Sequence, residues 1–253
     1  MRIIALINQK GGSGKTTTTV NLGACLAKLG KRVLIIDIDP QAHATVHLGK
    51  DLQKLESSIY EVLITGKSLK DVISKTEMDN LELAPSHINL SGAEIELVNM
   101  IGRETILKDS INKLKHKYDY ILIDCPPSLG LLTLNALTTA NEVMIPIQTE
   151  YLALEGMSKL VSTIEIVKNR INKDLEITGI IPTMFDSRTN LSREVLNNIT
   201  GYFKKKVFKT VIRQNISLAE APSYGKPIIM YNTRSHGSED YTKLAKEVVR
   251  RGG

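Results

Sequence analysis

Residues 8–19 read Asn8-Gln9-Lys10-Gly11-Gly12-Ser13-Gly14-Lys15-Thr16-Thr17-Thr18-Thr19, and this stretch decides the fold of the chain. An apolar run, Ile3 to Ile7, leads into it, and apolar residues at helical spacing from Val20 to Leu29 lead out. The run predicts a short buried strand, and the later spacing predicts a helix. A strand, a glycine-rich turn with Lys-Thr, and a helix together form a phosphate-binding arrangement.

The residue types of this loop suit an anionic ligand. Glycines let the backbone N–H groups turn toward an anion with no Cβ in the way. The helix that begins here adds the positive end of its dipole to the same place. We expect the Lys15 ammonium to reach the β- and γ-phosphates of a nucleotide and the Thr16 hydroxyl to contact Mg²⁺. The alternative, a chance glycine-rich turn, is disfavoured because motif, strand and helix coincide.

The loop departs from the pattern G-x-x-x-x-G-K-[ST] at one position. Gln9 stands where the first glycine is expected, and a second lysine, Lys10, lies five residues before Lys15. In this the sequence resembles the deviant Walker A ATPases of the ParA/MinD superfamily. The resemblance implies that Lys10 reaches across a dimer interface to the nucleotide of a second copy of the chain.

The whole chain fits an α/β P-loop NTPase with a mostly parallel twisted sheet and helices on both faces. Its 253 residues suit a single domain, 1–253, without internal repeat or linker. No apolar run approaches the roughly 18 residues of a membrane span. The N-terminus lacks a signal-peptide pattern.

Cys25 and Cys125 have no metal-ligand spacing, so we expect two buried thiols in a reducing cytoplasm. We also expect long helices over residues 91–117 and from Glu150 to Arg170.

The net charge of +6 is unevenly placed. Residues 1–185 hold 20 Lys and Arg against 21 Asp and Glu, whereas residues 186–253 hold 13 against 6. This basic last quarter indicates an anionic partner surface, either nucleic acid or membrane. A solvated basic face is the plain alternative.

Two apolar segments end in carboxylates. Val33 to Ile36 leads into Asp37-Ile38-Asp39-Pro40-Gln41, and Tyr120 to Ile123 leads into Asp124. Parallel strands place such residues at the carboxyl edge of the sheet, where ligands of doubly wound folds bind. The second segment has the Walker B arrangement, whose carboxylate accepts from the Mg²⁺ shell beside Thr16.

The same two segments strengthen the family resemblance. Asp37 to Thr45 resembles switch I of ParA proteins, with Ala42-His43 in place of the usual Gly-Asn, and Asp124-Cys125-Pro126-Pro127 resembles switch II. The resemblance implies that Asp39 positions the attacking water and that Asp37 supports Mg²⁺ or the loop. It makes Lys10, Lys15, Asp39 and Asp124 the catalytic candidates. Thr16 is the expected Mg²⁺ ligand, with Asp37, Asp39 and Asp124 near its shell.

The C-terminal stretch Ile216 to Pro227 also resembles small ParA and Soj proteins, so the likeness runs from residue 3 to about 248. The resemblance implies that loops near 182–186 and 213–222 frame the adenine. The residues expected to contact ATP are Lys10, Gly11, Gly12, Ser13, Gly14, Lys15, Thr16, Thr17, Met184 and Asn215. Two positions that are usually basic are Gln214 and Ser217 here. The candidate DNA contacts are therefore Arg188, Lys204, Lys205, Lys206, Arg213, Arg234, Lys243, Lys246, Arg250 and Arg251.

The leading hypothesis is a cytoplasmic, Mg²⁺-dependent partition ATPase. By resemblance, an ATP-bound homodimer binds DNA without sequence preference, associates with the nucleoid, and releases DNA after hydrolysis stimulated by a ParB-type protein. No helix-turn-helix precedes Ile3, so we expect the small form without an operator-binding head. DNA binding by a dimer doubles the phosphate contacts and makes the affinity salt-sensitive.

Two other functions stay open, and a third, iron–sulfur chemistry, is disfavoured. A MinD-like membrane regulator needs a C-terminal amphipathic helix with bulky apolar residues, whereas residues 241–253 carry only small or medium ones and are expected to pack on the sheet. Iron–sulfur redox chemistry needs suitably placed cysteines, which this chain lacks. A ParA-like ATPase that positions a protein cargo fits the sequence as well as one that moves DNA.

Overall fold

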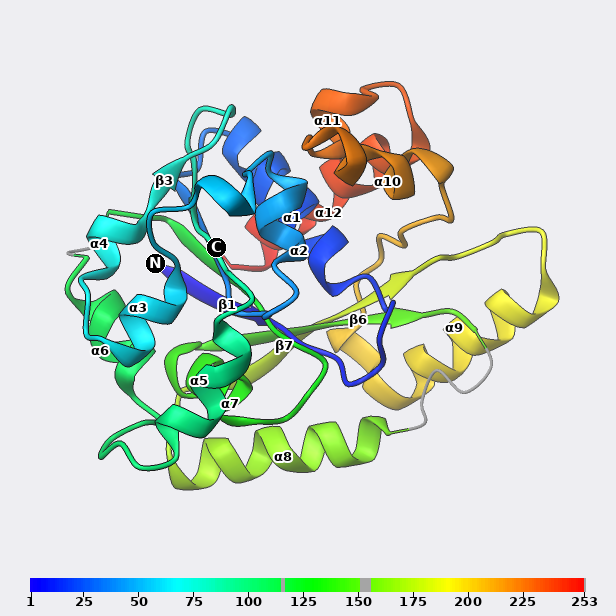
Figure 1. The fold of residues 1–253 in the computed structure, drawn as a ribbon. Coiled ribbons are helices and arrows are strands. Elements are labelled where there is room, and N and C mark those ends of the chain that lie inside the picture. The colour runs from blue at the N-terminus through cyan, green and yellow to red at the C-terminus, as the bar shows by residue number, and fades with distance from the viewer. Residues whose placement is uncertain (115–116, 151–155, 253) are drawn as a thin grey trace.

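The computed structural model of the chain describes residues 1–114, 117–150 and 156–252. Within them, seven strands form one sheet in the order β3-β4-β2-β5-β1-β6-β7 (Figure 1). The strands are β1 (Arg2–Leu6), β2 (Val33–Asp37), β3 (Ser74–Lys75), β4 (Leu81–Ala84), β5 (Tyr120–Asp124), β6 (Glu142–Gln148) and β7 (Glu176–Thr183). All neighbours are parallel except β3 and β4, so the predicted mostly parallel α/β fold is confirmed.

Helices cover both faces of this sheet. The α-helices are α1 (Lys15–Lys28), α2 (His43–His47), α3 (Ile59–Ile64), α4 (Leu69–Val72), α5 (Leu90–Leu97), α6 (Ile106–Asn112), α7 (Leu131–Thr139), α8 (Met157–Arg170), α9 (Asn190–Phe203), α10 (Ile216–Glu220), α11 (Ile228–Tyr231) and α12 (His236–Arg251). Short 3-10 turns are η1 (Leu52–Lys54), η2 (Lys204–Lys206) and η3 (Ala221–Tyr224).

The strands divide their side chains between two apolar cores. In β1, Ile3 and Ala5 enter the core under α3 to α9, while Ile4 and Leu6 enter the core under α1, α11 and α12. This alternation follows from the two-residue period of a strand. Figure 1 shows the two helical layers on opposite sides of the sheet. Because both faces are covered, the central strands read as continuous apolar runs.

The carboxyl ends of the strands meet at one edge, and this edge carries the polar residues. Asp37 of β2 is the register partner of Asp124 of β5, which in turn pairs with Leu6 of β1. On the other side of β1, Gln148 of β6 is the register partner of Thr183 of β7. The loop that follows β1 therefore begins with the ends of β2 and β5 on one side and the ends of β6 and β7 on the other.

Two helix predictions differ from the structure. The helix expected over 91–117 is two helices, α5 and α6, separated by residues 98–105, which include Gly102 at φ 71°, and residues 115–116 of the expected helix lie outside the described residues. A left-handed residue cannot continue a right-handed helix. The helix expected from Glu150 is described only from Met157 onward, and the part predicted at 151–155 lies outside the described residues.

The C-terminal helix, which the sequence predicts to pack on the sheet, packs chiefly against α1. Its apolar side chains Tyr241, Leu244 and Val248 are buried against α1. The Tyr241 hydroxyl lies 3.1 Å from the Thr18 hydroxyl of α1. The apolar face of α12 is thus already covered within the chain. Both cysteines are buried and free, which confirms that prediction.

Candidate functional site

The loop between β1 and α1 is shaped by its glycines and by Asn8. Gly12 and Gly14 adopt φ 71° and 89°, a region that is strained for residues with a Cβ. The buried Asn8 amide donates to the Pro146 carbonyl at 2.7 Å, and its Oδ1 accepts from the Lys10 N–H at 3.0 Å. The start of the loop is thereby fixed to β6. The sequence therefore builds a rigid turn whose N–H groups can converge on one point.

Two polar groups in this loop lack a strong protein partner. The buried Ser13 hydroxyl makes no hydrogen bond within the described part of the chain. Lys15 is only 7% exposed, and its Nζ contacts the Lys10 carbonyl at a long 3.5 Å. Burial lowers the pKa of the Lys15 ammonium, although the Asp124 and Asp39 carboxylates oppose this. A buried cation and an unpaired buried donor beside convergent N–H groups fit a phosphate chain.

Asp124 connects the end of β5 to the first turn of α1. It is fully buried and accepts hydrogen bonds from the Thr16 hydroxyl at 2.7 Å and the Thr19 hydroxyl at 2.9 Å. Burial raises its pKa to about 6, and the nearby Asp39 carboxylate acts in the same direction. A divalent cation at this place would favour the ionised form.

Asp37, one strand away, has a different set of neighbours. It accepts from the Thr45 N–H at 2.9 Å, from the Thr45 hydroxyl at 2.7 Å and from the Asp39 N–H at 3.2 Å. These bonds tie the end of β2 to α2. Of the two predicted roles, support of Mg²⁺ or of the loop, the contacts favour support of the loop.

Asp39 lies at the mouth of the site. Its Oδ1 accepts from the Gln41 N–H at 2.9 Å, and its backbone carbonyl accepts from the Ser86 hydroxyl at 2.6 Å. Ala42, at the usual glycine position of the family, adopts a left-handed φ of 53°. The segment therefore keeps the turn that glycine would favour, and the Asp39 carboxylate stays beside Asp124 and Lys15.

The residues present fit a nucleotide-bound magnesium ion. Thr16 and Asp124 lie together beside the phosphate loop, with Asp39 close by. No cluster of three or more His, Cys, Asp or Glu side chains able to hold a metal occurs in the described residues. Mg²⁺ is commonly held by one or two protein groups, by water and by substrate phosphates rather than by an all-protein cage.

Of the two predicted adenine-side residues, Met184 is connected to the phosphate loop through Gln148. Met184 adopts a left-handed φ of 53°. The next residue, Phe185, pairs with the segment before Asn215: its N–H donates to the Ile212 carbonyl, and its carbonyl accepts from the Gln214 N–H. The neighbouring Asn215 has a buried Oδ1 that accepts no hydrogen bond within the described chain. An unused buried acceptor fits the exocyclic amine of a purine.

Two further residues, missed in the sequence analysis, complete this side of the site. Gln148 Nε2 donates to the Gly12 carbonyl at 3.0 Å and lies 3.1 Å from the Met184 sulfur. The Thr183 hydroxyl donates to the Ser13 carbonyl at 2.9 Å. Both are polar residues at the end of an apolar strand, the same signal that identified Asp37 and Asp124.

Lys10 differs from Lys15 in where its side chain lies. It is half exposed, and its Nζ is 3.8 Å from the Glu150 carboxylate, an exposed group at the end of β6. Its ammonium forms no ion pair with Asp39 or Asp124. Lys10 is therefore accessible at the surface, beside a loop whose buried lysine faces inward.

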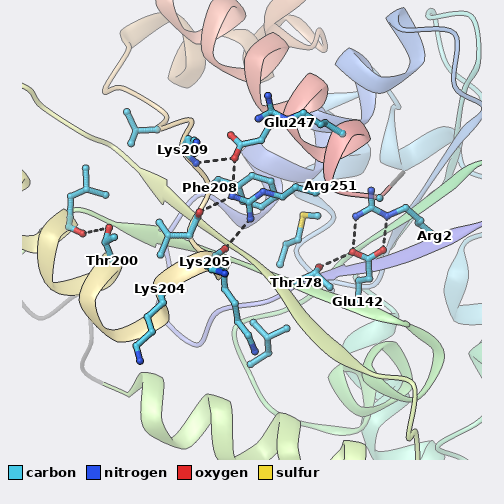
Figure 2. A pocket seen from close by; sticks show the side chains of 18 of the residues that line it. Arg2, Glu142, Thr178, Thr200, Lys204, Lys205, Phe208, Lys209, Glu247 and Arg251 are labelled. Carbon is cyan, nitrogen blue, oxygen red and sulfur yellow. Dashed lines mark hydrogen bonds and ion pairs between the residues drawn. The ribbon is translucent and has the colours of Figure 1, made fainter.

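The basic residues of the last quarter gather at the opposite edge of the sheet. Lys204, Lys205, Lys206, Arg250 and Arg251 surround one cleft with the start of β1, β6 and β7 (Figure 2). Lys243 and Lys246 line an adjoining groove along α12. Arg188 and Arg234 lie outside both hollows.

Four of the predicted DNA contacts are held by carboxylates, and one of them is Lys243, which pairs with Glu239 at 2.6 Å. Arg213 pairs with Asp240 and Glu239, both at 2.6 Å, and Arg188 pairs with Asp186 at 2.7 Å. Arg251 pairs with Glu247 at 2.8 Å and stacks on the Phe208 ring at 4.0 Å. The Arg213–Asp240 pair fastens residue 213 to α12, and Arg251 of α12 also donates to the Val207 carbonyl at 2.7 Å, so these two arginines have a structural task.

None of the helices that the structure describes combines the length and the apolar character needed to cross a bilayer.

Comparison with known proteins places the site in a family. Residues 1–177 match the family described as AAA domain. The sporulation initiation inhibitor protein Soj of Bacillus subtilis is 54% identical over 251 residues, which cover 99% of each chain. The chromosome partitioning protein ParA of Myxococcus xanthus is 49% identical over 250 residues, covering 99% of this chain and 88% of that one.

A solved structure has the same architecture and carries a nucleotide. The cobyrinic acid a,c-diamide synthase of Mycobacterium smegmatis, crystallised with ADP and magnesium, superposes with a TM-score of 0.88 at 38% identity. The match covers 99% of this chain and 94% of the other.

Proposed function

The chain belongs to the Soj/ParA family of P-loop ATPases, and from this premise we propose that it is an ATP-dependent DNA-partitioning ATPase. The observation that carries the proposal is that one phosphate loop holds two lysines of opposite exposure: Lys15 is buried, and Lys10 is accessible at the surface. Lys15 serves the nucleotide of its own chain. Lys10 is free to serve the nucleotide of a second copy.

ATP binds between the loop after β1 and the ends of β6 and β7. The loop residues Lys10 to Thr17 receive the phosphates, and Met184 and Asn215 lie on the adenine side. The unpaired Ser13 hydroxyl and Asn215 Oδ1 support this placement because each gains a partner when the nucleotide enters. Gln148 and Thr183 keep the loop and the adenine side at a fixed separation.

Thr16 and Asp124 would hold magnesium beside the phosphates, and ATP is hydrolysed by transfer of its terminal phosphoryl group to water. When bound, Mg²⁺ neutralises charge on the phosphate oxygens. Lys15 stabilises the negative charge that develops there, and Asp39 orients the attacking water. Asp37 keeps the backbone around Asp39 in place through Thr45.

A second copy of the chain completes the site. The two copies meet across their phosphate loops, and each Lys10 reaches the phosphates of the other copy. The exposure of Lys10, whose ammonium contacts only the exposed Glu150 carboxylate among the described acidic groups, supports this role. Dimerisation places two basic last quarters in one particle, and a bivalent particle binds a polyanion far more tightly than one copy does.

DNA binds to the basic residues of that last quarter, and a ParB-type protein stimulates hydrolysis. Lys204, Lys205, Lys206, Lys246 and Arg250 are the strongest DNA candidates because no ion pair occupies them within the described chain. Arg213 and Arg251 are weaker candidates, because their guanidinium groups already bind carboxylates.

ATP hydrolysis by the Lys15→Ala variant tests the nucleotide site. We expect turnover with Mg²⁺ to fall by at least about a hundredfold, because the variant loses the buried cation that stabilises the phosphate charge. Lys28→Ala is the matched control, since Lys28 is exposed on the last turn of the same helix. Equal turnover in Lys15→Ala and the control would remove the nucleotide site from this loop.

A further inference from the structure

The cleft at the amino ends of the strands is large and lies away from the nucleotide site. It has a volume of about 1200 Å³ and is enclosed by β6, β7, α9, η2, residues 207–211 and the last turn of α12. We name it the amino-edge cleft. Figure 2 shows Lys204 and Lys205 extending from one wall, with Lys209, Glu247 and Arg251 on another. The proposed ATPase mechanism uses none of its internal surface.

The floor of the amino-edge cleft is apolar. Ile177 of β7, Leu196 of α9 and Val211 are only half-buried and line the hollow. Beneath them lie the buried side chains of Met144 and Phe208. An apolar floor of this kind gains free energy when another apolar group covers it.

The rim is strongly cationic. Seven Lys and Arg side chains line the cleft, against two carboxylates. Both carboxylates are already used: Glu142 binds Arg2 and the Thr178 hydroxyl, and Glu247 binds Arg251, the Lys209 N–H and Thr210. Five cationic residues of the rim therefore have no carboxylate within 4.0 Å among the described residues: Lys204, Lys205, Lys206, Lys209 and Arg250.

The backbone holds part of this rim in a strained conformation. Lys204 adopts φ 51° and ψ −123°, which is costly for a residue with a side chain. The turn lets α9 end and η2 begin, so that three consecutive lysines lie along one side of the cleft. On the other side, Glu247 fixes the backbone of Lys209 at 3.0 Å.

We propose that the amino-edge cleft binds an acidic peptide segment of a partner protein, anchored by a bulky apolar side chain. The apolar residue of the segment covers Ile177, Leu196 and Val211, and the flanking carboxylates meet the rim lysines. The combination of floor and rim favours a peptide over DNA. Phosphate contacts need only the cations, and a duplex backbone brings no apolar group to fill a hollow of this size.

The binding has a consequence that rests on the proposed function. Because the peptide uses lysines that are also the strongest DNA candidates, the acidic partner and DNA compete for one surface. The partner therefore displaces the chain from DNA without ATP hydrolysis. Peptide binding itself is independent of nucleotide, so it can be measured even if the ATPase proposal fails.

Two labelled peptides of equal charge test the proposal on the full chain without nucleotide. One has alternating Asp and Glu around a central Leu-Phe-Leu, and the other has three Ser at the centre. We expect the apolar peptide to bind about tenfold more tightly by fluorescence anisotropy, since burying one large apolar side chain is worth at least that factor.

Three variants locate the binding. Val211→Ser, in the floor, should weaken the apolar peptide about fivefold without nucleotide and leave duplex DNA binding, measured with ATP, unchanged. Lys205→Glu, in the rim, should weaken both ligands. The control Lys173→Glu, an exposed lysine outside the cleft, should weaken neither. If Val211→Ser lowers the melting temperature, the same measurement is made with Ile177→Thr, which also adds a hydroxyl to the floor but keeps a branched side chain.

Equal affinity for the two peptides would overturn the proposal and leave a plain polyanion patch. So would a loss of DNA and peptide affinity together in Val211→Ser, or binding of DNA with no binding of either peptide. In the last case the cleft belongs to the DNA surface.

Discussion

Asp37 and Asp124 lie side by side at two strand ends but are held by different neighbours. Asp124 is bound by hydroxyl groups of α1, and Asp37 is bound by the backbone and hydroxyl of Thr45 in α2. Burial raises the pKa of each carboxyl group, and their proximity raises that of Asp37 further. One residue type at equivalent strand positions thus has two sets of contacts: Asp37 anchors the loop through Thr45, and Asp124 is the residue that we propose lies beside Mg²⁺.

Asp39→Ala tests the role of the third carboxylate. We expect ATP turnover to fall by about a hundredfold, which is the low end of the rate loss seen when a group that assists proton transfer is removed. The affinity for ATP should stay unchanged. The variant should remain as an ATP-bound dimer on DNA. Asp174→Ala, an exposed carboxylate between α8 and β7, is the control. Normal hydrolysis in Asp39→Ala would show that another group orients the water.

His47 makes stability depend on pH. Burial lowers its pKa from 6.5 to about 4 in the folded chain. Below pH 6.5 the unfolded chain binds a proton that the folded chain rejects, so the unfolding free energy falls as pH falls toward 4. The slope from this residue reaches at most about 1.4 kcal/mol per pH unit.

His47→Gln isolates this effect from that of the other buried groups. Urea unfolding at a series of pH values between 6.5 and 4 should give a flatter profile for the variant than for the natural chain. Parallel profiles would mean that His47 titrates normally in the fold.

At the scale of elements, the C-terminal helix does more than cover α1. Asp240 and Glu247, both nearly buried on α12, accept hydrogen bonds from the backbone N–H groups of Arg213, Lys209 and Thr210. Residues 207–213 run beside β7, and the Phe208 N–H donates to Ile180. The helix therefore sets the position of the segment that leads to Asn215 and the adenine side of the site.

The contact between α2 and η3 depends on two glycines. A Cβ on Gly225 would lie 2.7 Å from the Gly49 Cα, and Gly225 also adopts φ 61°. Gly225→Ala should therefore lower the unfolding free energy by clearly more than the roughly 1–2 kcal/mol that a left-handed alanine costs.

Gly66→Ala is the matched control for Gly225→Ala. Gly66 has a similar φ of 74°, but no atom lies within 4 Å of its added Cβ. Urea unfolding of both variants separates the steric clash from the backbone strain. Equal losses of stability would show that the α2–η3 contact adjusts without cost.

Across the whole molecule, the sequence predicted the parts of the site that depend on local pattern. The phosphate loop, Asp37 and Asp124 follow from single motifs at the ends of apolar strands, and all three meet at one edge. Gln148 and Thr183 carry the same local signal, a polar residue at the end of an apolar strand, but their contact with the loop depends on β6 and β7 following β1 in the sheet, and the signal alone does not give that order. The split of 91–117 escaped because the pattern remained helical across Gly102.

The arrangement of the basic residues in space could not be predicted from the sequence either. Composition revealed the charge of the last quarter, but not that lysines of η2 and arginines of α12, more than forty residues apart, share one cleft. It also could not reveal that Arg213 is paired with Asp240, because that pair depends on the tertiary contact between residues 207–213 and α12. The Arg251–Glu247 pair, by contrast, has the i,i+4 spacing of one helix and is a local pattern.

The central claim is that ATP joins two copies of the chain through Lys10 and that only the dimer binds DNA. Analytical ultracentrifugation with duplex DNA tests it most directly, comparing the natural chain, Lys10→Ala and the exposed-lysine control Lys67→Ala, each with ATP and with ADP. We predict a DNA-bound dimer for the natural chain and Lys67→Ala with ATP, and free monomers for Lys10→Ala and for every chain with ADP. A Lys10→Ala dimer on DNA, or equal DNA binding with ADP, would contradict the account.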